Sequence, residues 1–135
     1  MMERLTFRSR RPRRGDVVCF KTDGIQGLPQ AQVYVKRVAG EPGEHLQIAD
    51  GKLNINGRYI VLSNASGAIS YFLPPLAGPP PAQTDLVVPK DCYFLLGDNS
   101  RNSLDSRFYG SVPRGNILGR ISFCYWPPHR VGKVK

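Results

Sequence analysis

The chain has 135 residues, the length of a single domain that can bury a core of its own. Apolar residues make up 41% of it, which excludes a chain that is disordered throughout. The formal charge is +9 at pH 7, and six arginines lie among the first fourteen residues: Arg4, Arg8, Arg10, Arg11, Arg13 and Arg14. Such an arm can meet nucleic acid or anionic lipid, but it is more often solvated. No apolar run of the printed sequence approaches the roughly 18 residues of a membrane span.

In chain order, most of the sequence consists of short runs with the two-residue alternation of β-strands. Residues 3–8 alternate like part of a strand, and turn signals of the hairpin type stand at Asp50-Gly51 and Asn56-Gly57. The further predicted strands are 15–21, 31–39, 46–48, 53–55, 59–61, 86–88, 93–96 and 116–126. Their spacing and turns predict a meander of short antiparallel strands.

Residues 63–84 break this regularity. Five prolines lie there, at positions 74, 75, 79, 80 and 81, and they predict an irregular insertion instead of a strand or a second domain. No segment shows helical periodicity for more than a turn or two. The sequence therefore predicts an all-β fold in one domain, 1–135.

Lys36 stands among apolar residues of the predicted strand 31–39. Alternation places Tyr34, Lys36 and Val38 on one face of that strand and Val33, Val35 and Arg37 on the other. A lysine with a pKa of ~10.4 is protonated at neutral pH, and it acts as a base only if burial lowers that pKa by about 3 units. Covering of this face would supply the burial, whereas exposure would make Lys36 an ordinary surface lysine.

A polar segment, 97–110, follows the apolar run 92–96. It contains two aspartates, two asparagines, three serines and two arginines, which can satisfy much of their own backbone through Asx and Ser turns. The segment is therefore predicted to be an ordered loop, either a self-capped surface loop or a functional one.

Cysteines and histidines give little sign of a site. Cys19, Cys92 and Cys124 each lie in an apolar run, which predicts buried free thiols. One disulfide bond could form in an oxidising compartment. His45 and His129 have no carboxylate or cysteine at metal-ligand spacing, so we expect surface histidines and no metal site. The tripeptide Arg14-Gly15-Asp16 is explained by a turn that leads into a strand.

Three blocks of the chain resemble the type I signal peptidases, a family of membrane-bound serine-lysine endopeptidases. Residues 12–20 are similar to that family's P-x-R-G-D-hydrophobic-F block, and residues 34–44 to its Y-hydrophobic-K-R-hydrophobic-x-G-x-P-G-D/E block. Residues 97–107 match its G-D-N-x-x-N-S-x-D-S-R block. We name these the first, second and third motif blocks. The resemblance implies a signal-peptidase-type β-sheet or barrel catalytic domain that needs no cofactor.

The resemblance also implies roles for single residues. Lys36 would be the general base that takes the proton of a nucleophilic serine, and the Ser103 hydroxyl would orient its amine. Tyr34 and Val35 would lie along the bound substrate. Supporting residues would hold the loop under the lysine: Arg37, Asp98, Asn99, Asn102, Asp105 and Arg107.

Two ion pairs are predicted for this supporting group. Asp105 and Arg107 are two residues apart, so in an extended segment both would point the same way, and a carboxylate beside a guanidinium can form a bidentate pair. The second predicted pair joins Asp98 to Arg37.

The family's nucleophile, a serine in a Ser-Met-x-Pro context upstream of the first block, has no match in the 135 residues. Ser9 precedes an arginine and lies too close to that block. The sequence therefore suggests a catalytic-domain fragment, a mis-started reading frame or a degenerate paralogue, and the abrupt start favours an N-terminally incomplete domain. Such a chain should not cleave alone, since a lysine base without a serine cannot form an acyl-enzyme. A strand cut at its start would leave an unpaired edge and exposed apolar surface, from which we expect low solubility.

The predicted function is thus that of a signal peptidase I-like serine endopeptidase, of whose Ser/Lys dyad only the lysine side is present. Its partners would be secretory preproteins and the membrane surface, at the extracytoplasmic face of the cytoplasmic membrane, and no nucleic acid. One alternative is an inactive remnant that still binds preproteins. Another is a basic β-barrel that binds nucleic acid or anionic membrane.

Overall fold

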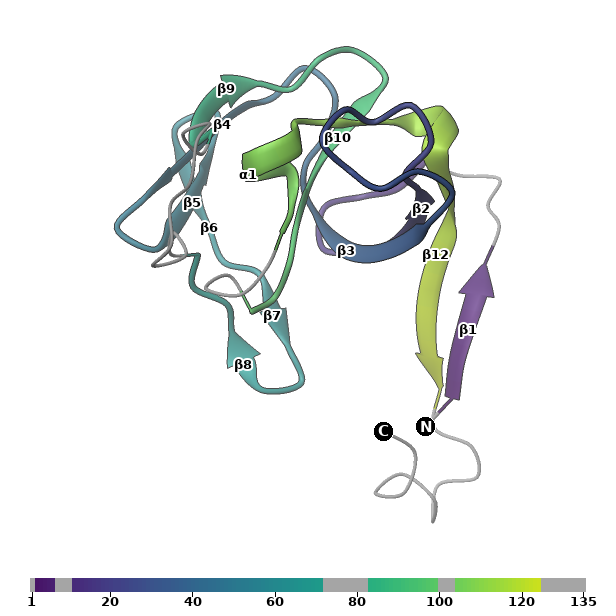
Figure 1. The fold of residues 1–135 in the computed structure, drawn as a ribbon. Helices are drawn as coiled ribbons and strands as arrows, with labels where there is room; N and C mark the ends of the chain where they lie inside the picture. Colours follow the sequence, from purple (N-terminus) through teal and green to yellow (C-terminus); the bar gives the residue numbers. More distant parts are fainter. Residues whose placement is uncertain (1, 7–10, 72–82, 100–103, 125–135) are drawn as a thin grey trace.

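The structure is a computed structural model that describes residues 2–6, 11–71, 83–99 and 104–124, with the backbone alone for 2–6 and 122–124. Its described residues form antiparallel sheets of six, four and two strands (Figure 1). The six-stranded sheet has the order β1 (Met2–Thr6), β12 (Ile117–Cys124), β2 (Val17–Lys21), β3 (Val33–Gly40), β10 (Cys92–Leu96), β11 (Val112–Pro113). The four-stranded sheet has the order β6 (Arg58–Ile60), β5 (Lys52–Ile55), β4 (His45–Ala49), β9 (Asp85–Val87). This confirms the all-β prediction.

Two tight turns make the β4-β5-β6 meander. Asp50 and Gly51 have φ of 52° and 77°, and Asn56 and Gly57 have φ of 52° and 84°. Positive φ at both central residues defines the turn whose twist matches that of the flanking strands, and Asn, Asp and Gly tolerate it best. The predicted hairpins are therefore present where their turn residues stand.

The prediction for residues 63–84 is wrong at the start of that segment. A short hairpin forms there from β7 (Ser63–Asn64) and β8 (Gly67–Ala68), and Tyr71 makes an isolated bridge to Gly51 of the four-stranded sheet. Two residues on each side are too few for a visible alternation, so the pattern of the sequence could not reveal them. The prolines that predicted irregular chain lie outside the described residues.

Strand β10 is buried on both faces and separates two apolar clusters. We call the cluster that joins the two larger sheets the inner core; its buried members are Ala39, Leu46, Leu53, Ile55, Leu62, Tyr71, Val88, Phe94 and Leu96. The cluster on the opposite face of the six-stranded sheet is the outer core, with Val18, Phe20, Ile25, Leu28, Val38, Tyr93, Leu95 and Val112. Because successive strand residues point to opposite faces, a strand between two cores is apolar throughout.

The chain crosses from one sheet to the other at Gly40, the last residue of β3. A Cβ atom built there would lie 2.9 Å from Leu46 Cδ1, 3.0 Å from Val88 Cγ2 and 3.2 Å from Phe94 Cβ. Glycine is thus required because no side chain fits between the inner-core residues. This close approach brings the second motif block against the strand that leads into the third.

Two short helical turns complete the description: α1 (Ser106–Tyr109) and the 3-10 turn η1 (Arg114–Asn116). Strands β1 and β12 run side by side, with β1 at one edge of the six-stranded sheet (Figure 1). Within the described residues, no helix has the length and apolar character needed to cross a membrane.

Candidate functional site

Lys36 lies on a covered face of β3. It stands opposite Val18 of β2 in the antiparallel register, so the two side chains share one face. Val18 and, two residues along β3, Val38 are fully buried, and Tyr34 packs against the same outer core. Lys36 itself is partly buried. Of the two alternatives open in the sequence, a covered lysine and a surface lysine, the structure therefore shows the covered one.

Burial lowers the pKa of the Lys36 amine below its ordinary value, because the charged ammonium loses hydration there. The negative charge of Asp105 acts in the opposite direction and raises this pKa, while the positive charge of Arg107 lowers it. Since these two charges belong to one ion pair, their effects on the amine largely oppose each other. Loss of hydration therefore remains the dominant influence on the pKa of Lys36.

Asp105 and Arg107 form the predicted ion pair, and both side chains are fully buried. Arg107 Nε donates to Asp105 Oδ1 and Arg107 Nη2 to Asp105 Oδ2, each at 2.8 Å. The premise of an extended segment was wrong for Arg107, which lies in the first turn of α1. Asp105 is extended and is the N-cap of that turn, and its side chain accepts a bond from the Arg107 backbone N–H at 3.2 Å.

Two hydrogen bonds close the third motif block at its base. Gly97 N donates to Asp105 Oδ2 at 3.0 Å, and Leu95 N donates to Ser106 Oγ at 2.9 Å. Both bonds join the end of β10 to the start of α1 and are buried. The intervening loop is therefore anchored at the two points where it enters and leaves the core.

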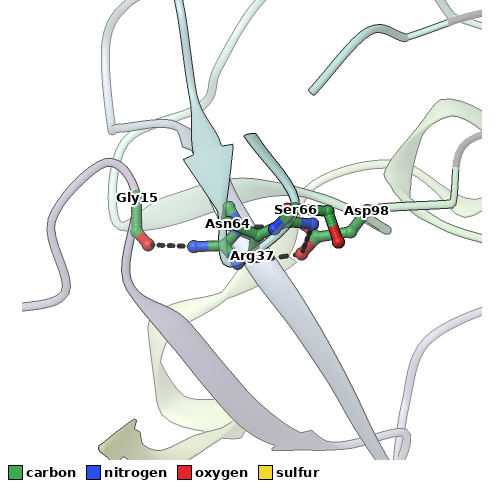
Figure 2. Close-up of polar contacts among 5 residues, drawn as sticks. All are labelled: Gly15, Arg37, Asn64, Ser66 and Asp98. Carbon is green, nitrogen blue, oxygen red and sulfur yellow. Dashed lines mark hydrogen bonds and ion pairs between the residues drawn. The ribbon is translucent and has the colours of Figure 1, made fainter. Parts of the chain in front are cut away.

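Arg37 and Asp98 form the second predicted pair (Figure 2). Because successive strand residues point to opposite faces, Arg37 lies on the face of β3 opposite Lys36. Arg37 Nε and Nη2 donate to the two carboxylate oxygens, each at 2.8 Å, and Arg37 Nη1 donates to Gly15 O at 2.9 Å. The guanidinium thus joins all three motif blocks. Burial opposes ionisation of Asp98, but bonds from Arg37 and Asn64 outweigh it, so the pKa of Asp98 is lowered.

Asn64 is a member of this cluster that sequence reasoning missed. Its Nδ2 donates to Asp98 Oδ2 at 3.1 Å, and its Oδ1 accepts from Ser66 N at 2.8 Å. The second bond is an Asx turn, for which Asn64-Ala65-Ser66 was a visible signal. The first is a contact between residues 34 positions apart that no local pattern predicts.

Further contacts hold the first block against the second. Arg14 Nη1 donates to Glu44 Oε1 at 2.5 Å, and Arg14 N donates to Glu41 Oε2 at 2.8 Å. Asp16 N donates to Arg13 O, and Asp16 Oδ2 accepts from Arg13 N, both at 2.9 Å. The Arg14-Gly15-Asp16 tripeptide is therefore the expected turn into β2.

The two residues predicted to lie along a substrate point to opposite faces of β3. Tyr34 packs against the outer core, while the side chain of Val35 is 50% exposed. Both directly precede Lys36 in β3. Asn99 is exposed in the bend after Asp98, and the predicted site residues Ser103 and Asn102 lie outside the described residues.

Cys19 and Cys92 are free thiols, the first buried and the second half-buried, and burial raises the pKa of both. The side chain of Cys124 lies outside the description, as does His129. His45 lies on the surface, yet it has a carboxylate partner that its sequence spacing did not reveal, with Nε2 at 2.6 Å from Asp85 Oδ1. No group of three or more His, Cys, Asp or Glu that could hold a metal occurs in the described part of the chain.

Comparison with known proteins agrees with this arrangement. Residues 1–126 match the family described as "Signal peptidase, peptidase S26". The chain is 33% identical over 133 residues to a probable signal peptidase I-2 of Synechocystis and 34% identical over 137 residues to a signal peptidase I of Leptolyngbya laminosa. These alignments cover 98% and 99% of the chain, which spans 56% and 63% of the two relatives.

A similar solved structure is the crystal structure of a signal peptidase I from Enterococcus faecalis. The TM-score is 0.59 at 25% sequence identity, and the match covers 84% of this chain and 98% of that one. The predicted sheet architecture is thus shared with an experimentally determined fold.

Proposed function

Because the chain belongs to the signal peptidase family, peptidase S26, we propose that it carries the lysine half of a Ser/Lys endopeptidase site that cleaves signal peptides from secretory preproteins. The observation that supports this most directly is the Lys36 amine on a covered sheet face beside a neutralised buried ion pair. Such a place favours the neutral amine, which is the form that accepts a proton.

In the proposed reaction, the neutral Lys36 amine takes the proton of a serine hydroxyl as that oxygen attacks the scissile carbonyl. The resulting ammonium then gives the proton to the leaving amine, and an acyl-enzyme ester remains. The amine, neutral again, takes a proton from water, whose oxygen attacks the ester. The resulting ammonium returns this proton to the serine oxygen as the ester bond breaks, which releases the signal peptide with a free carboxyl terminus and restores the neutral amine. Ser103 is proposed to orient the amine through its hydroxyl.

The supporting residues act through geometry in this proposal. The Asp105–Arg107 pair fixes the base of the third block under Lys36, and the Arg37–Asp98 pair fixes its start from the opposite face. Errors of about 1 Å in such a constellation cost large factors in rate, so a buried bidentate pair is a suitable anchor.

We propose that the nucleophile is a serine that does not belong to these 135 residues, which contain no Ser-Met-x-Pro sequence. We propose that the complete enzyme acts at the extracytoplasmic face of the cytoplasmic membrane, with preproteins as substrates and no cofactor. The alternative function is preprotein binding without cleavage, for which the same fold would suffice.

Two measurements test the proposal. The first follows the Lys36 side-chain signals by NMR as pH is raised, and we expect a midpoint clearly below the ordinary lysine pKa of ~10.4. The second measures cleavage of a preprotein by the longest in-frame product that contains these 135 residues. Lys36→Ala should abolish turnover, while the matched control Lys21→Ala should retain it.

The results of these measurements distinguish catalysis from preprotein binding and from nucleic-acid binding. Equal turnover in the two variants would refute the role of Lys36. Binding of a preprotein by the longest product, without cleavage, would support the alternative of a binding domain. Salt-sensitive binding of an oligonucleotide, with no affinity for preproteins, would point to the basic nucleic-acid-binding reading instead.

A further inference from the structure

Two buried tyrosine hydroxyls lie near the Asp105–Arg107 pair without a hydrogen-bond partner among the described residues. They belong to Tyr71 and Tyr109. Burial raises the pKa of both phenols, and the charge of Asp105 raises it further. A buried hydroxyl without a partner destabilises a fold, so its presence needs a reason. Both residues pack their rings against an apolar core, so a role of the ring would account for a tyrosine at these positions.

The two tyrosines pack on opposite faces of the six-stranded sheet. Tyr71 is a member of the inner core, on the side where Leu96 and Phe94 point. Tyr109 packs against the outer core, on the side of Val18 and Val38. Since Lys36 stands opposite Val18 in the register and two residues before Val38, Tyr109 shares the face of Lys36 and Tyr71 does not.

Tyr109 belongs to an aromatic group beside Lys36. Its ring centroid lies 6.3 Å from that of Phe20, and Phe20 makes an edge-to-face contact of 6.0 Å with Tyr34. Phe20 and Tyr34 are directly opposite each other in β2 and β3, one step along the same face from Lys36. Phe20 and Tyr34 thus follow Lys36 along the same face of the sheet, and the ring of Tyr109 packs against Phe20 on that face.

The position of Tyr109 is set by the same residues that form the ion pair. Asp105 caps α1, and Tyr109 is the last residue of that helix; Tyr109 N donates to Asp105 O at 3.3 Å. A single four-residue turn therefore brings Arg107 into the core and places the ring of Tyr109 over the outer core. The Arg107 charge that acts on Lys36 and the Tyr109 ring on the same sheet face therefore come from one element.

We propose that Tyr109 is a positioning residue whose ring, together with Phe20 and Tyr34, keeps water from the Lys36 amine. This inference rests on the proposed function of Lys36 as a base. The charged and titratable groups that act on the amine in the described structure are Asp105 and Arg107, with the phenols of Tyr34 and Tyr109 on the same face. The ring carries the effect, and the hydroxyl is dispensable for it.

The experiment compares the 135-residue chain with Tyr109→Leu, Tyr109→Phe and the matched control Tyr71→Leu. Both leucine variants remove a tyrosine whose buried hydroxyl has no described partner and whose phenol pKa is raised by the charge of Asp105; Tyr71 is buried and Tyr109 half-buried. The Lys36 side-chain signals are titrated by NMR, with near-ultraviolet circular dichroism as the test of folding. We expect Tyr109→Leu to raise the pKa of Lys36 by about one unit, since rehydration favours the ammonium, and Tyr71→Leu to leave it unchanged.

Tyr109→Phe keeps the ring, so the pKa of Lys36 should stay low in this variant and the melting temperature should not fall. A raised pKa in Tyr109→Phe would overturn the role of the ring even if the leucine variant does not fold. Equal shifts in Tyr109→Leu and Tyr71→Leu would mean general loosening of the core and would also overturn it.

The pKa of Lys36 in the wild-type chain and its change in Tyr109→Leu test the role of Lys36 and the role of Tyr109 separately. A low wild-type pKa of Lys36 that Tyr109→Leu leaves unchanged would remove the inference and leave the proposed base intact. An ordinary lysine pKa in the wild-type chain would remove both, because there would then be no dehydrated amine to protect.

Discussion

Replacing Asp105 by asparagine is the sharpest test of what holds the site together. The substitution keeps the shape of the side chain but removes its charge. Asp105 accepts at least four hydrogen bonds: from Gly97 N at 3.0 Å, and from Arg107 N at 3.2 Å, Nε at 2.8 Å and Nη2 at 2.8 Å. An asparagine amide would turn one of the two accepting oxygens into a donor that faces other donors.

The expected cost follows from burial. Asp105 and Arg107 are both 0% exposed, so the variant leaves a guanidinium without its counterion in a place water does not reach. Breaking a buried pair on one side costs about 3–5 kcal/mol, a large part of the roughly 5–15 kcal/mol that stabilises a typical domain. With a urea m-value of about 2 kcal/mol per molar, the unfolding midpoint should fall by roughly 2 M.

Urea unfolding followed by circular dichroism measures this change. Asp91→Asn is the matched control, because Asp91 pairs with Arg11 at 3.6 Å with 61% of its side chain exposed, and exposed pairs contribute less than about 1 kcal/mol. Adding Arg107→Met to Asp105→Asn should recover part of the loss, since it removes the uncompensated charge. A loss below about 1 kcal/mol for Asp105→Asn, equal to that of the control, would refute the reasoning.

Three other substitutions test packing and charge around the site. Gly40→Ala should destabilise the fold by about 1–3 kcal/mol in urea unfolding, because its Cβ would lie 2.9 Å from Leu46 Cδ1. Gly115 has open space around it, so the stability of the control Gly115→Ala should stay within about 0.5 kcal/mol of the parent chain. Equal losses of stability in the two variants would count against the packing argument. The lowered pKa of Lys36 means that the unfolded chain binds more protons than the folded chain between that pKa and ~10.4. The melting temperature should therefore rise with pH in this window, and the melting temperature of Lys36→Met should lack that rise. The lowered pKa of Asp98 contributes stability that is fully present above pH ~3.9 and is lost as the pH falls through the pKa of Asp98 in the folded chain. Asp98→Asn should therefore lose less stability on acidification than the parent chain. An equal loss in the two chains would contradict the stabilising bond from Arg37.

Much of the fold could be read from local patterns. Asp50-Gly51 and Asn56-Gly57 specify hairpin turns through their own backbone preferences, and both adopt the left-handed φ those turns require. The strands around them were predicted to within one or two residues. The β7-β8 hairpin was missed, because a ladder of two residues on each side has no periodicity to detect.

The site divides in the same way. The Asp105–Arg107 pair joins residues two positions apart, and the prediction of it succeeded even though the assumed extended backbone was wrong at Arg107. The Arg37–Asp98 pair spans 61 residues and was predicted only with the family resemblance in hand. Asn64, which completes that cluster, had no signal in the sequence for its contact with Asp98.

The sequence by itself determined which face of its strand Lys36 occupies, because alternation along a strand depends only on neighbouring residues. Only the tertiary structure decided that this face is covered. Val18 in β2 stands opposite Lys36, and Tyr109 in α1 packs on the same face of the sheet, although both lie far from Lys36 along the chain. A pKa depends on the whole surroundings of an amine, and these surroundings exist only after distant segments have packed together.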